Sequence, residues 1–222
     1  HWPEKGERRR VIAAASPTPP TIDGRLSPDE WDTAARLTGF TLHNSQDQAP
    51  QQTQVFATWD RQRLYLAFSC AQPDGKPKTT VSGRDGNVWE DDAVELFIQP
   101  DPASATYYQF IGNSSGAIYD ARGSTEPQWN GDWTYSASVG TDAWFGELSI
   151  PLSSLGIAAD APAVIGFNAC RDAQNAGSGA SCWSPVSGSF HNPAMFGLVE
   201  LSREQTSTRE EAGRAAETPK TI

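Results

Sequence analysis

Eleven short runs of β-forming residues, each bounded by turn-forming residues, leave few folds open to this chain. The predicted strands are residues 40–43, 54–59, 63–70, 93–99, 107–113, 117–121, 135–139, 144–150, 164–171, 181–184 and 196–201. Short strands at regular spacing, with almost no helical sequence between them, predict an all-β fold, an antiparallel β-sandwich or jelly roll. The sequence has no strand–helix alternation and no glycine fingerprint, which disfavours a nucleotide-binding fold.

One short helix is predicted before all of these strands. Ser27 is a suitable N-cap, Pro28 suits the first helical turn, and Glu30 lies three residues after the cap. We therefore expect a helix from residue 28 to about residue 35, with Trp31 packed inward.

A single domain is predicted over residues 21–202, with a segment of different composition on either side. Residues 1–20 are charged and end in a Pro-rich stretch, which is typical of a disordered or linker segment. Residues 203–222 contain no aromatic residue and few large aliphatic ones, so they cannot bury enough surface to become ordered. We expect this second segment to be a disordered tail or linker.

Composition and charge exclude several classes of partner. A chain of 222 residues can form one substantial core, and its eight tryptophans are many for that length, as is common where flat rings meet a ligand. The net charge of -10 would repel phosphate backbones, so no nucleic acid is expected as a partner. No run approaches the roughly 20 apolar residues that cross a bilayer, so no membrane span is expected.

Residues 89–98 place an indole and three carboxylates directly before an alternating strand. In that strand Val94 shares a face with residues 96 and 98, while Glu95 and Phe97 lie on the other face. A glutamate is disfavoured inside a strand, and a tryptophan at its mouth is costly to leave in water. Trp89 and Glu95 therefore indicate a binding site beside a buried β-core.

Seven segments, in this order, resemble a known family. They are residues 21–24 with Trp31 following; 59–60 before 64–67; 89–98; Tyr108, Gln109 and Phe110 with Asn113 and Gly116; 147–151; 165–168; and 192–197. The chain is similar here to the family 9 carbohydrate-binding module and its looser relatives, over roughly residues 20–201.

The resemblance implies a non-catalytic β-sandwich that binds a polysaccharide such as xylan or β-glucan. Such modules are typically appended to glycan-degrading enzymes, so a covalently linked catalytic domain is an expected partner. In the family two aromatic rings hold the terminal sugar, and by position Trp89 matches the first ring, Glu95 the acceptor carboxylate and Phe190 the second ring. An indole face suits the C–H face of a pyranose, and a carboxylate can accept from its hydroxyls.

Three further residues are candidate sugar ligands. Asn113 belongs to the matching pattern, Trp129 is a candidate loop platform for further sugar units, and Arg171 can bridge vicinal hydroxyls if the hairpin turns it inward. For Trp129 the alternative is that it caps the sandwich. The chain departs from the family where Ile111 replaces a basic residue and Cys170 replaces an amide.

The acidic residues beside Trp89 have two possible roles. Glycosidases use two carboxylates that approach one bond from opposite faces. Glu90, Asp91 and Asp92 are adjacent and alternate in direction when extended, which disfavours catalysis. The family often carries structural calcium, and Asp60, Asp91 and Asp92 are the predicted oxygen ligands.

Cys170 and Cys182 flank a segment rich in Gly, Ala, Ser and Asn that is typical of a hairpin tip. A disulfide between them is predicted and would place the protein in an oxidising compartment, secreted or periplasmic. Two reduced cysteines in neighbouring strands are the alternative.

Two other functions remain open. His191 and Met195 are candidate axial ligands of a haem-binding electron-transfer domain with a related sandwich fold. A structural sandwich that packs against a partner domain would instead bury Trp89 and Phe190.

Overall fold

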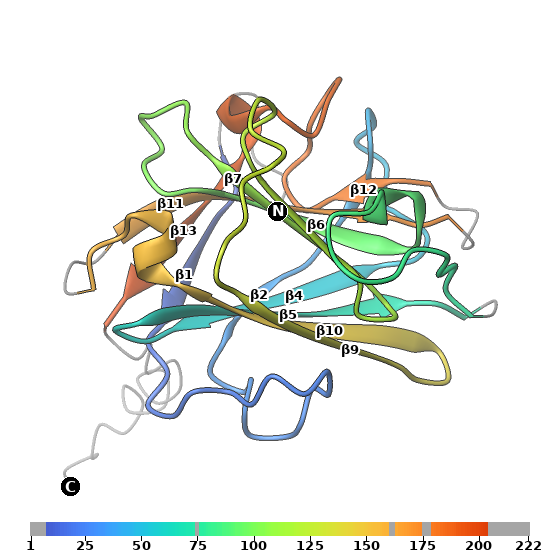
Figure 1. Cartoon of the computed structure of the whole chain (residues 1–222), viewed down its shortest axis with the longest axis horizontal. Helices are drawn as coiled ribbons and strands as arrows, with labels where there is room; N and C mark the ends of the chain where they lie inside the picture. Colours follow the sequence, from blue (N-terminus) through green and yellow to red (C-terminus); the bar gives the residue numbers. More distant parts are fainter. Residues whose placement is uncertain (1–7, 74–75, 160–162, 175–178, 204–222) are drawn as a thin grey trace, which may run out of the picture.

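The structure is a computed structural model and describes residues 8–73, 76–159, 163–174 and 179–203. Two β-sheets lie face to face as the two layers of a sandwich (Figure 1). The strand pairs are antiparallel except for β1 and β13, which are parallel. The predicted all-β class is confirmed.

The first sheet has the strand order β1-β13-β11-β6-β7-β8, with β12 paired to β11 and β3 paired to β12. Its strands are β1 (Arg10–Ala14), β3 (Thr41–Leu42), β6 (Ala93–Gln99), β7 (Tyr108–Asn113), β8 (Ile118–Arg122), β11 (Ala163–Asp172), β12 (Ser181–Cys182) and β13 (Gly197–Ser202).

The second sheet has the order β2-β4-β5-β10-β9. Its strands are β2 (Ala35–Leu37), β4 (Thr53–Trp59), β5 (Arg63–Ala71), β9 (Thr134–Val139) and β10 (Ala143–Pro151). Three short 3₁₀ turns complete the described elements: η1 (Val88–Glu90), η2 (Leu152–Leu155) and η3 (Pro193–Met195).

The main core lies between the two sheets. Val94, Leu96 and Ile98 of β6 belong to this core together with Leu66 of β5 and Trp144 of β10. On the opposite face of β6, Phe97 belongs to a separate apolar cluster. The predicted alternation is therefore confirmed, and it directs Glu95 away from the main core, toward the outer face of the first sheet.

Each of the eleven predicted strands overlaps an observed one, whereas the predicted helix is wrong. Residues 28–30 form turns, and Asp29 has a φ of 75°, in the left-handed region that interrupts a right-handed helix. The prediction did not include β1 or β2, and β2 begins at Ala35, where the helix was expected to end.

A buried carboxylate orders the segment in place of the helix. Glu147 of β10 accepts hydrogen bonds from the backbone N–H groups of Asp23 (3.0 Å) and Gly24 (2.8 Å) and from the Trp31 indole (2.9 Å). Gly24 has a φ of 85°, and a Cβ there would lie 2.8 Å from the Ala137 backbone, so this turn requires glycine. Trp31 is buried as predicted, but the carboxylate holds it in a turn.

The predicted linker before residue 21 differs from the structure, because residues 10–14 form β1. The indole N–H of Trp59 donates to the carbonyl of Ala13 (3.1 Å), and the hydroxyl of Thr58 donates to that of Ala14 (2.8 Å). Residues 1–7, and 204–222 of the predicted tail, lie outside the described residues. Within the described parts, no helix is both long and apolar enough to span a bilayer.

Candidate functional site

A cleft of about 330 Å³ lies on the outer face of the first sheet. Strands β6, β7 and β8 supply its floor, η1 supplies one wall, and the β8–β9 loop and the segment before η3 supply the rest. Its lining residues are Trp89, Glu95, Gln109, Tyr119, Gly123, Ser124, Pro127, Ser189, Phe190 and His191. The three residues that the sequence singled out for direct contact, Trp89, Glu95 and Phe190, are thus brought together from distant parts of the chain.

Trp89 is the exposed aromatic ring of the cleft. Its side chain is 37% exposed, although it follows the fully buried Val88 in η1. The ring of Tyr119 on β8 meets the indole edge-on, with centroids 5.1 Å apart and planes at 85°. This contact fixes the orientation of the indole and leaves part of its surface open to solvent.

Phe190 forms another part of the cleft wall and is held by neighbouring rings. It packs edge-on against His43 at 4.7 Å and against Phe97 at 6.5 Å between centroids. Phe97 is fully buried beside Glu95 on the outer face of β6, so the apolar cluster beneath the cleft anchors this ring.

Glu95 is the carboxylate on the cleft floor. It is 6% exposed and accepts a hydrogen bond from Gln109 Nε2 at 2.6 Å across the β6–β7 pair. Desolvation raises the pKa of Glu95, although hydrogen bonds with Asp172 and Gln109 act in the opposite direction. The pKa of Asp172 on β11 is raised well above its usual value by burial and then by the charge of Glu95. Glu95 and Asp172 therefore form a coupled carboxyl pair, and burial together with their mutual repulsion favours retention of a proton by the pair.

His191 lines the cleft, and its contact with Tyr107 bears on which ring nitrogen carries the proton. The Tyr107 hydroxyl lies 2.8 Å from His191 Nδ1, and Ser124 hydrogen-bonds to the same tyrosine. Burial lowers the pKa of His191, which favours the neutral ring. When Nδ1 accepts from the phenol, the neutral ring carries its proton on Nε2, where it is a donor.

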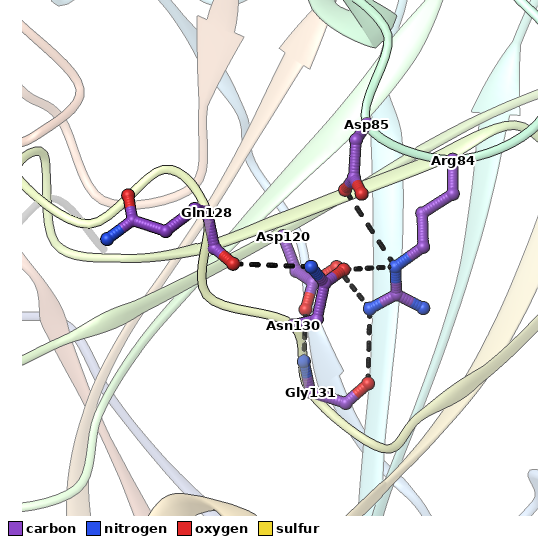
Figure 2. Close-up of polar contacts among 6 residues, drawn as sticks. All are labelled: Arg84, Asp85, Asp120, Gln128, Asn130 and Gly131. Carbon is purple, nitrogen blue, oxygen red and sulfur yellow. Dashed lines mark hydrogen bonds and ion pairs between the residues drawn. The ribbon is translucent and has the colours of Figure 1, made fainter.

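Arg84 holds the β8–β9 loop against the sheet. Its guanidinium donates to Asp120 Oδ1 (2.6 Å), to Asn130 Oδ1 (2.5 Å) and to the carbonyl of Gly131 (3.1 Å), and Figure 2 shows the three acceptors converging on it. Asp120 is fully buried and also accepts from the Gly131 N–H. This cluster ties residues 128–131 to β8, next to Pro127 in the cleft wall.

Arg171 does not enter the cleft, and its predicted role in sugar binding is wrong. In the β6–β11 register Arg171 is opposite Val94, whereas Cys170 is opposite Glu95. Its side chain therefore points to the inner face, where it is fully buried and donates to Ala71 O (2.8 Å) and Gln72 Oε1 (2.7 Å). Strand alternation allows only one of two neighbours to face the site.

Asn113 and Trp129 also lie outside the cleft lining. Asn113 is fully buried and donates to Asp91 Oδ2 (2.9 Å), while its own Oδ1 accepts from the N–H of Ala117 (2.8 Å). Trp129 packs on Tyr108 at 4.9 Å between centroids and borders the main core. Asn113 is structural in this fold, whereas Trp129 packs against the main core as the capping alternative expects, and its role as a platform for further sugar units stays a prediction.

The three predicted calcium ligands do not form a site. Asp60 lies in the β4–β5 turn, where it accepts from Arg63 N (2.8 Å) and the Tyr65 hydroxyl (2.7 Å). Asp91 and Asp92 instead bind backbone N–H groups of residues 78–81. The described residues contain no group of three or more His, Cys, Asp or Glu side chains placed to hold a metal ion. A calcium ion elsewhere in the protein stays a prediction.

Cys170 and Cys182 are free buried thiols in the structure, so the predicted disulfide is not formed there. They are nevertheless directly opposite each other in the β11–β12 pair. The Trp183 N–H donates to Ala169 O at 2.8 Å, which makes the cysteines a non-hydrogen-bonded pair with closely spaced side chains.

The lining residues that were not predicted as ligands include Gln109, Tyr119 and His191. Gln109 and Tyr119 share the outer face with Glu95 because of the β6–β7–β8 register. Strand alternation places Gln109 on the outer face once the pairing of β6 with β7 is known. His191 had been considered only as a haem ligand, together with Met195, yet its Nδ1 lies against Tyr107 and Met195 Sδ lies 3.8 Å from Ser187 Oγ.

Aromatic rings around buried hydrogen-bonding groups, on the outer face of a β-sandwich, are the features of a carbohydrate-binding domain. The chain matches the family described as carbohydrate family 9 binding domain-like over residues 22–204, and it belongs to that family. This agrees with the resemblance found in the sequence and makes the domain a non-catalytic carbohydrate-binding one.

Sequence and structural relatives agree with this assignment. Endo-1,4-beta-xylanase A of Thermotoga neapolitana is 24% identical over 208 residues, which are 86% of this chain but only 18% of the xylanase. The chain therefore spans less than a fifth of that relative's length.

Three solved structures share the fold. A protein from Bacteroides uniformis, described as a candidate carbohydrate-binding protein, superposes with a TM-score of 0.73 at 18% identity, covering 88% of this chain and all of that one. A family 9 carbohydrate-binding module from Caldicellulosiruptor kristjanssonii in complex with glucose gives a TM-score of 0.64 at 15% identity, covering 91% of this chain and all of the module. The same organism's module in complex with cellotriose gives 0.60 at 14% identity, with coverages of 95% and 100%.

Proposed function

We propose that the cleft binds a pyranose unit of a neutral β-linked polysaccharide, such as xylan or a β-glucan, without catalysing any reaction on it. The observation that carries this proposal is the convergence of Trp89 and Phe190 on a cleft whose floor holds Glu95. The two rings supply flat apolar surface for the C–H faces of the sugar. The relatives in complex with glucose and cellotriose, and the xylanase relative, support the choice of ligand.

The polar groups of the cleft would orient the sugar. Glu95 accepts hydrogen bonds from two vicinal hydroxyls, Gln109 keeps the carboxylate in place, and His191 donates from Nε2 to a ring hydroxyl. The raised pKa values of Glu95 and Asp172 lower the negative charge at the floor, which suits a neutral ligand. A cleft of this size, with one carboxylate, predicts a weak interaction in the micromolar to millimolar range, roughly -4 to -8 kcal/mol.

The family assignment also supports proposals about the biological setting. We infer that the domain is secreted or periplasmic and works within a glycan-degrading system, covalently linked to a catalytic domain. Weak binding by a small module becomes useful in that arrangement, because the linked domain raises the effective concentration of the polysaccharide.

Calorimetric titration with cellotriose and xylotriose tests the cleft. We expect Trp89→Ala to weaken binding by about tenfold or more, because the indole supplies the largest exposed ring surface. The matched control is Ile12→Thr, since Ile12 is 46% exposed and lies on β1. Unchanged binding in the Trp89 variant, or equal losses in both variants, would rule out this cleft as the sugar site.

A further inference from the structure

A second pocket, of about 530 Å³, lies among the turns at the end of the sandwich. Three segments form it: residues 76–79 after β5, the β7–β8 turn, and the β9–β10 hairpin, whose tip is at the right of Figure 1. Its lining residues are Lys76, Pro77, Thr79, Ser114, Ser115, Val139, Gly140 and Thr141. This lining shares no residue with the cleft around Trp89.

One wall of the pocket is held by Asp91 and Asp92, two of the predicted calcium ligands. We call residues 76–81 the strap. Asp91 accepts from the N–H groups of Thr80 (2.8 Å) and Val81 (2.8 Å), and Asp92 accepts from the N–H of Lys78 (2.5 Å). Both carboxylates are fully buried, so the strap is fixed before any ligand arrives.

Asn113 connects the strap to the other two walls. Its side chain donates to Val81 O (3.0 Å) and accepts from the N–H of Ser115 (3.1 Å) in the β7–β8 turn. Its backbone carbonyl accepts from the hydroxyl of Tyr135 on β9 (2.8 Å). One network therefore positions all three walls, and the pocket is preformed.

The pocket contains a buried hydroxyl without a protein partner. Ser114 is 4% exposed, and its Oγ makes no hydrogen bond to any described residue. Buried polar groups in folded proteins are nearly always paired, so this hydroxyl calls for a partner that enters the pocket. Ser114 lines the pocket in the turn directly after β7.

The chemistry of the lining indicates what this partner is. Four hydroxyl side chains, those of Thr79, Ser114, Ser115 and Thr141, can donate to and accept from a polyhydroxylated ligand. Pro77 and the half-exposed Val139 supply apolar surface for a C–H face. The charged residue of the lining is the cation Lys76, which favours an anionic ligand at this position.

We propose that this pocket is a second carbohydrate-binding site and that it takes a sugar unit bearing a carboxylate, a uronic acid. Lys76 pairs with the carboxylate, Ser114 bonds a ring hydroxyl, and Val139 contacts the C–H face. The site is independent of the cleft, so a polysaccharide with acidic side groups engages both, and the two interactions reinforce each other.

The test measures binding of D-glucuronate by amide chemical-shift titration. We expect shifts at Ser115 and Gly140, affinity reduced about tenfold by Lys76→Met, and a comparable loss in Ser114→Ala. The Ser114 variant keeps the melting temperature of the original protein, because its hydroxyl has no partner to lose. Glucose should bind these residues at least about tenfold more weakly, since it lacks the carboxylate.

Three further measurements separate this site from the cleft and from unspecific anion binding. Trp89→Ala should retain glucuronate binding, even if the cleft fails to bind any neutral sugar. Acetate should not reproduce the shifts, and a glucuronate-substituted xylo-oligosaccharide should bind the Trp89 variant, which distinguishes a chain-borne unit from the free acid. Shifts confined to the cleft, equal effects of acetate, or unchanged affinity in both pocket variants would each overturn the proposal.

Discussion

The pKa values of Asp91 and Asp172 are shifted in opposite directions because the two carboxylates have different neighbours. Burial alone would raise the pKa of Asp91, but hydrogen bonds from Val81, Thr80 and Asn113 outweigh it, and the pKa is lowered. Asp172 is buried beside Glu95 with a second negative charge instead of donors, and its pKa is raised. In the sequence these residues are simply acidic. Their pKa values depend on the donors and charges that other strands and loops bring to them in the fold.

The Glu95–Asp172 pair predicts a pH-dependent stability. A carboxyl whose pKa is raised by folding binds its proton more tightly in the folded state. Its contribution to stability is therefore fully present below the pKa that it has in the unfolded chain. The free energy of unfolding then falls as pH rises toward the folded pKa, by up to about 1.4 kcal/mol per pH unit for one proton. Urea titrations between acidic and neutral pH measure this slope.

Asp172→Asn is the matched variant for this experiment. The amide still donates to Glu95 but carries no titrating proton, so the slope should be smaller than in the original protein. An unchanged slope would mean that Asp172 does not titrate in this range.

At the scale of elements, polar contacts position one loop of the cleft and one wall of the second pocket. The β8–β9 loop is anchored through Arg84 and Asp120, and the strap through Asp91 and Asp92. Turn-rich composition identified these stretches as loops, but their partners lie elsewhere in the chain. For this reason the sequence does not reveal that Asn113 is a structural residue that holds the strap.

Arg84→Met should destabilise the protein and weaken sugar binding together. The change leaves the buried Asp120 carboxylate without its cation and releases the loop that carries Pro127. We expect a loss of about 2 kcal/mol in the free energy of unfolding, less than for a fully buried pair because Arg84 is one-third exposed. Chemical denaturation and cellotriose titration measure the two effects.

The double variant Arg84→Met with Asp120→Leu provides the control. It removes the unpaired buried charge, so much of the stability should return while the loop stays unclamped and binding stays weak. If stability and binding recover together, Arg84 does not position the cleft wall.

The β11–β12 pair predicts that Cys170 and Cys182 can be oxidised to a disulfide. Directly opposite residues in a non-hydrogen-bonded pair have Cα atoms about 4.5 Å apart, within the range that a disulfide spans. The two thiols lose two electrons and two protons to oxidised glutathione, which becomes two reduced molecules. Closing a loop of this size should add roughly 3 kcal/mol to the free energy of unfolding.

Thiol titration of the denatured protein before and after oxidation measures this reaction. The chain has three cysteines, so we expect three reactive thiols to fall to one. Cys70 should remain, because it is fully buried and its pKa is raised to about 11, chiefly by burial. Three remaining thiols, or an equal rise in stability for Cys182→Ser, would contradict the prediction.

At the scale of the whole molecule, the N-terminal strand closes the sandwich. β1 pairs in parallel with β13, near the end of the described chain. The stability that β1 adds therefore depends on residues almost two hundred positions away. Four of its five residues are apolar, but charged residues precede it and a Pro-rich stretch follows it, and the composition of residues 1–20 as a whole predicts a linker. The partner strand and the Trp59 indole make it part of the domain.

A chain of residues 21–203 should therefore be less stable than one of residues 8–203. Removing β1 exposes Trp59 and Leu201 and leaves the hydrogen-bonding edge of β13 unpaired. We expect a loss on the order of 3 kcal/mol in the free energy of unfolding, measured by urea denaturation. Equal stability of the two chains would restore the interpretation of this segment as a linker.

The sequence by itself determined eleven of the thirteen described strands, because the two-residue alternation and the turn residues are local. It also determined that Val94 faces the core and Glu95 the opposite side, and it singled out Trp89, Glu95 and Phe190. Only the tertiary structure decided that Arg171 points inward, that Asn113 and Asp91 hold the strap, and that Gln109, Tyr119 and His191 join the cleft. The physical reason is register: which side chains meet depends on how distant strands pair, and a shift of one residue would reverse every face.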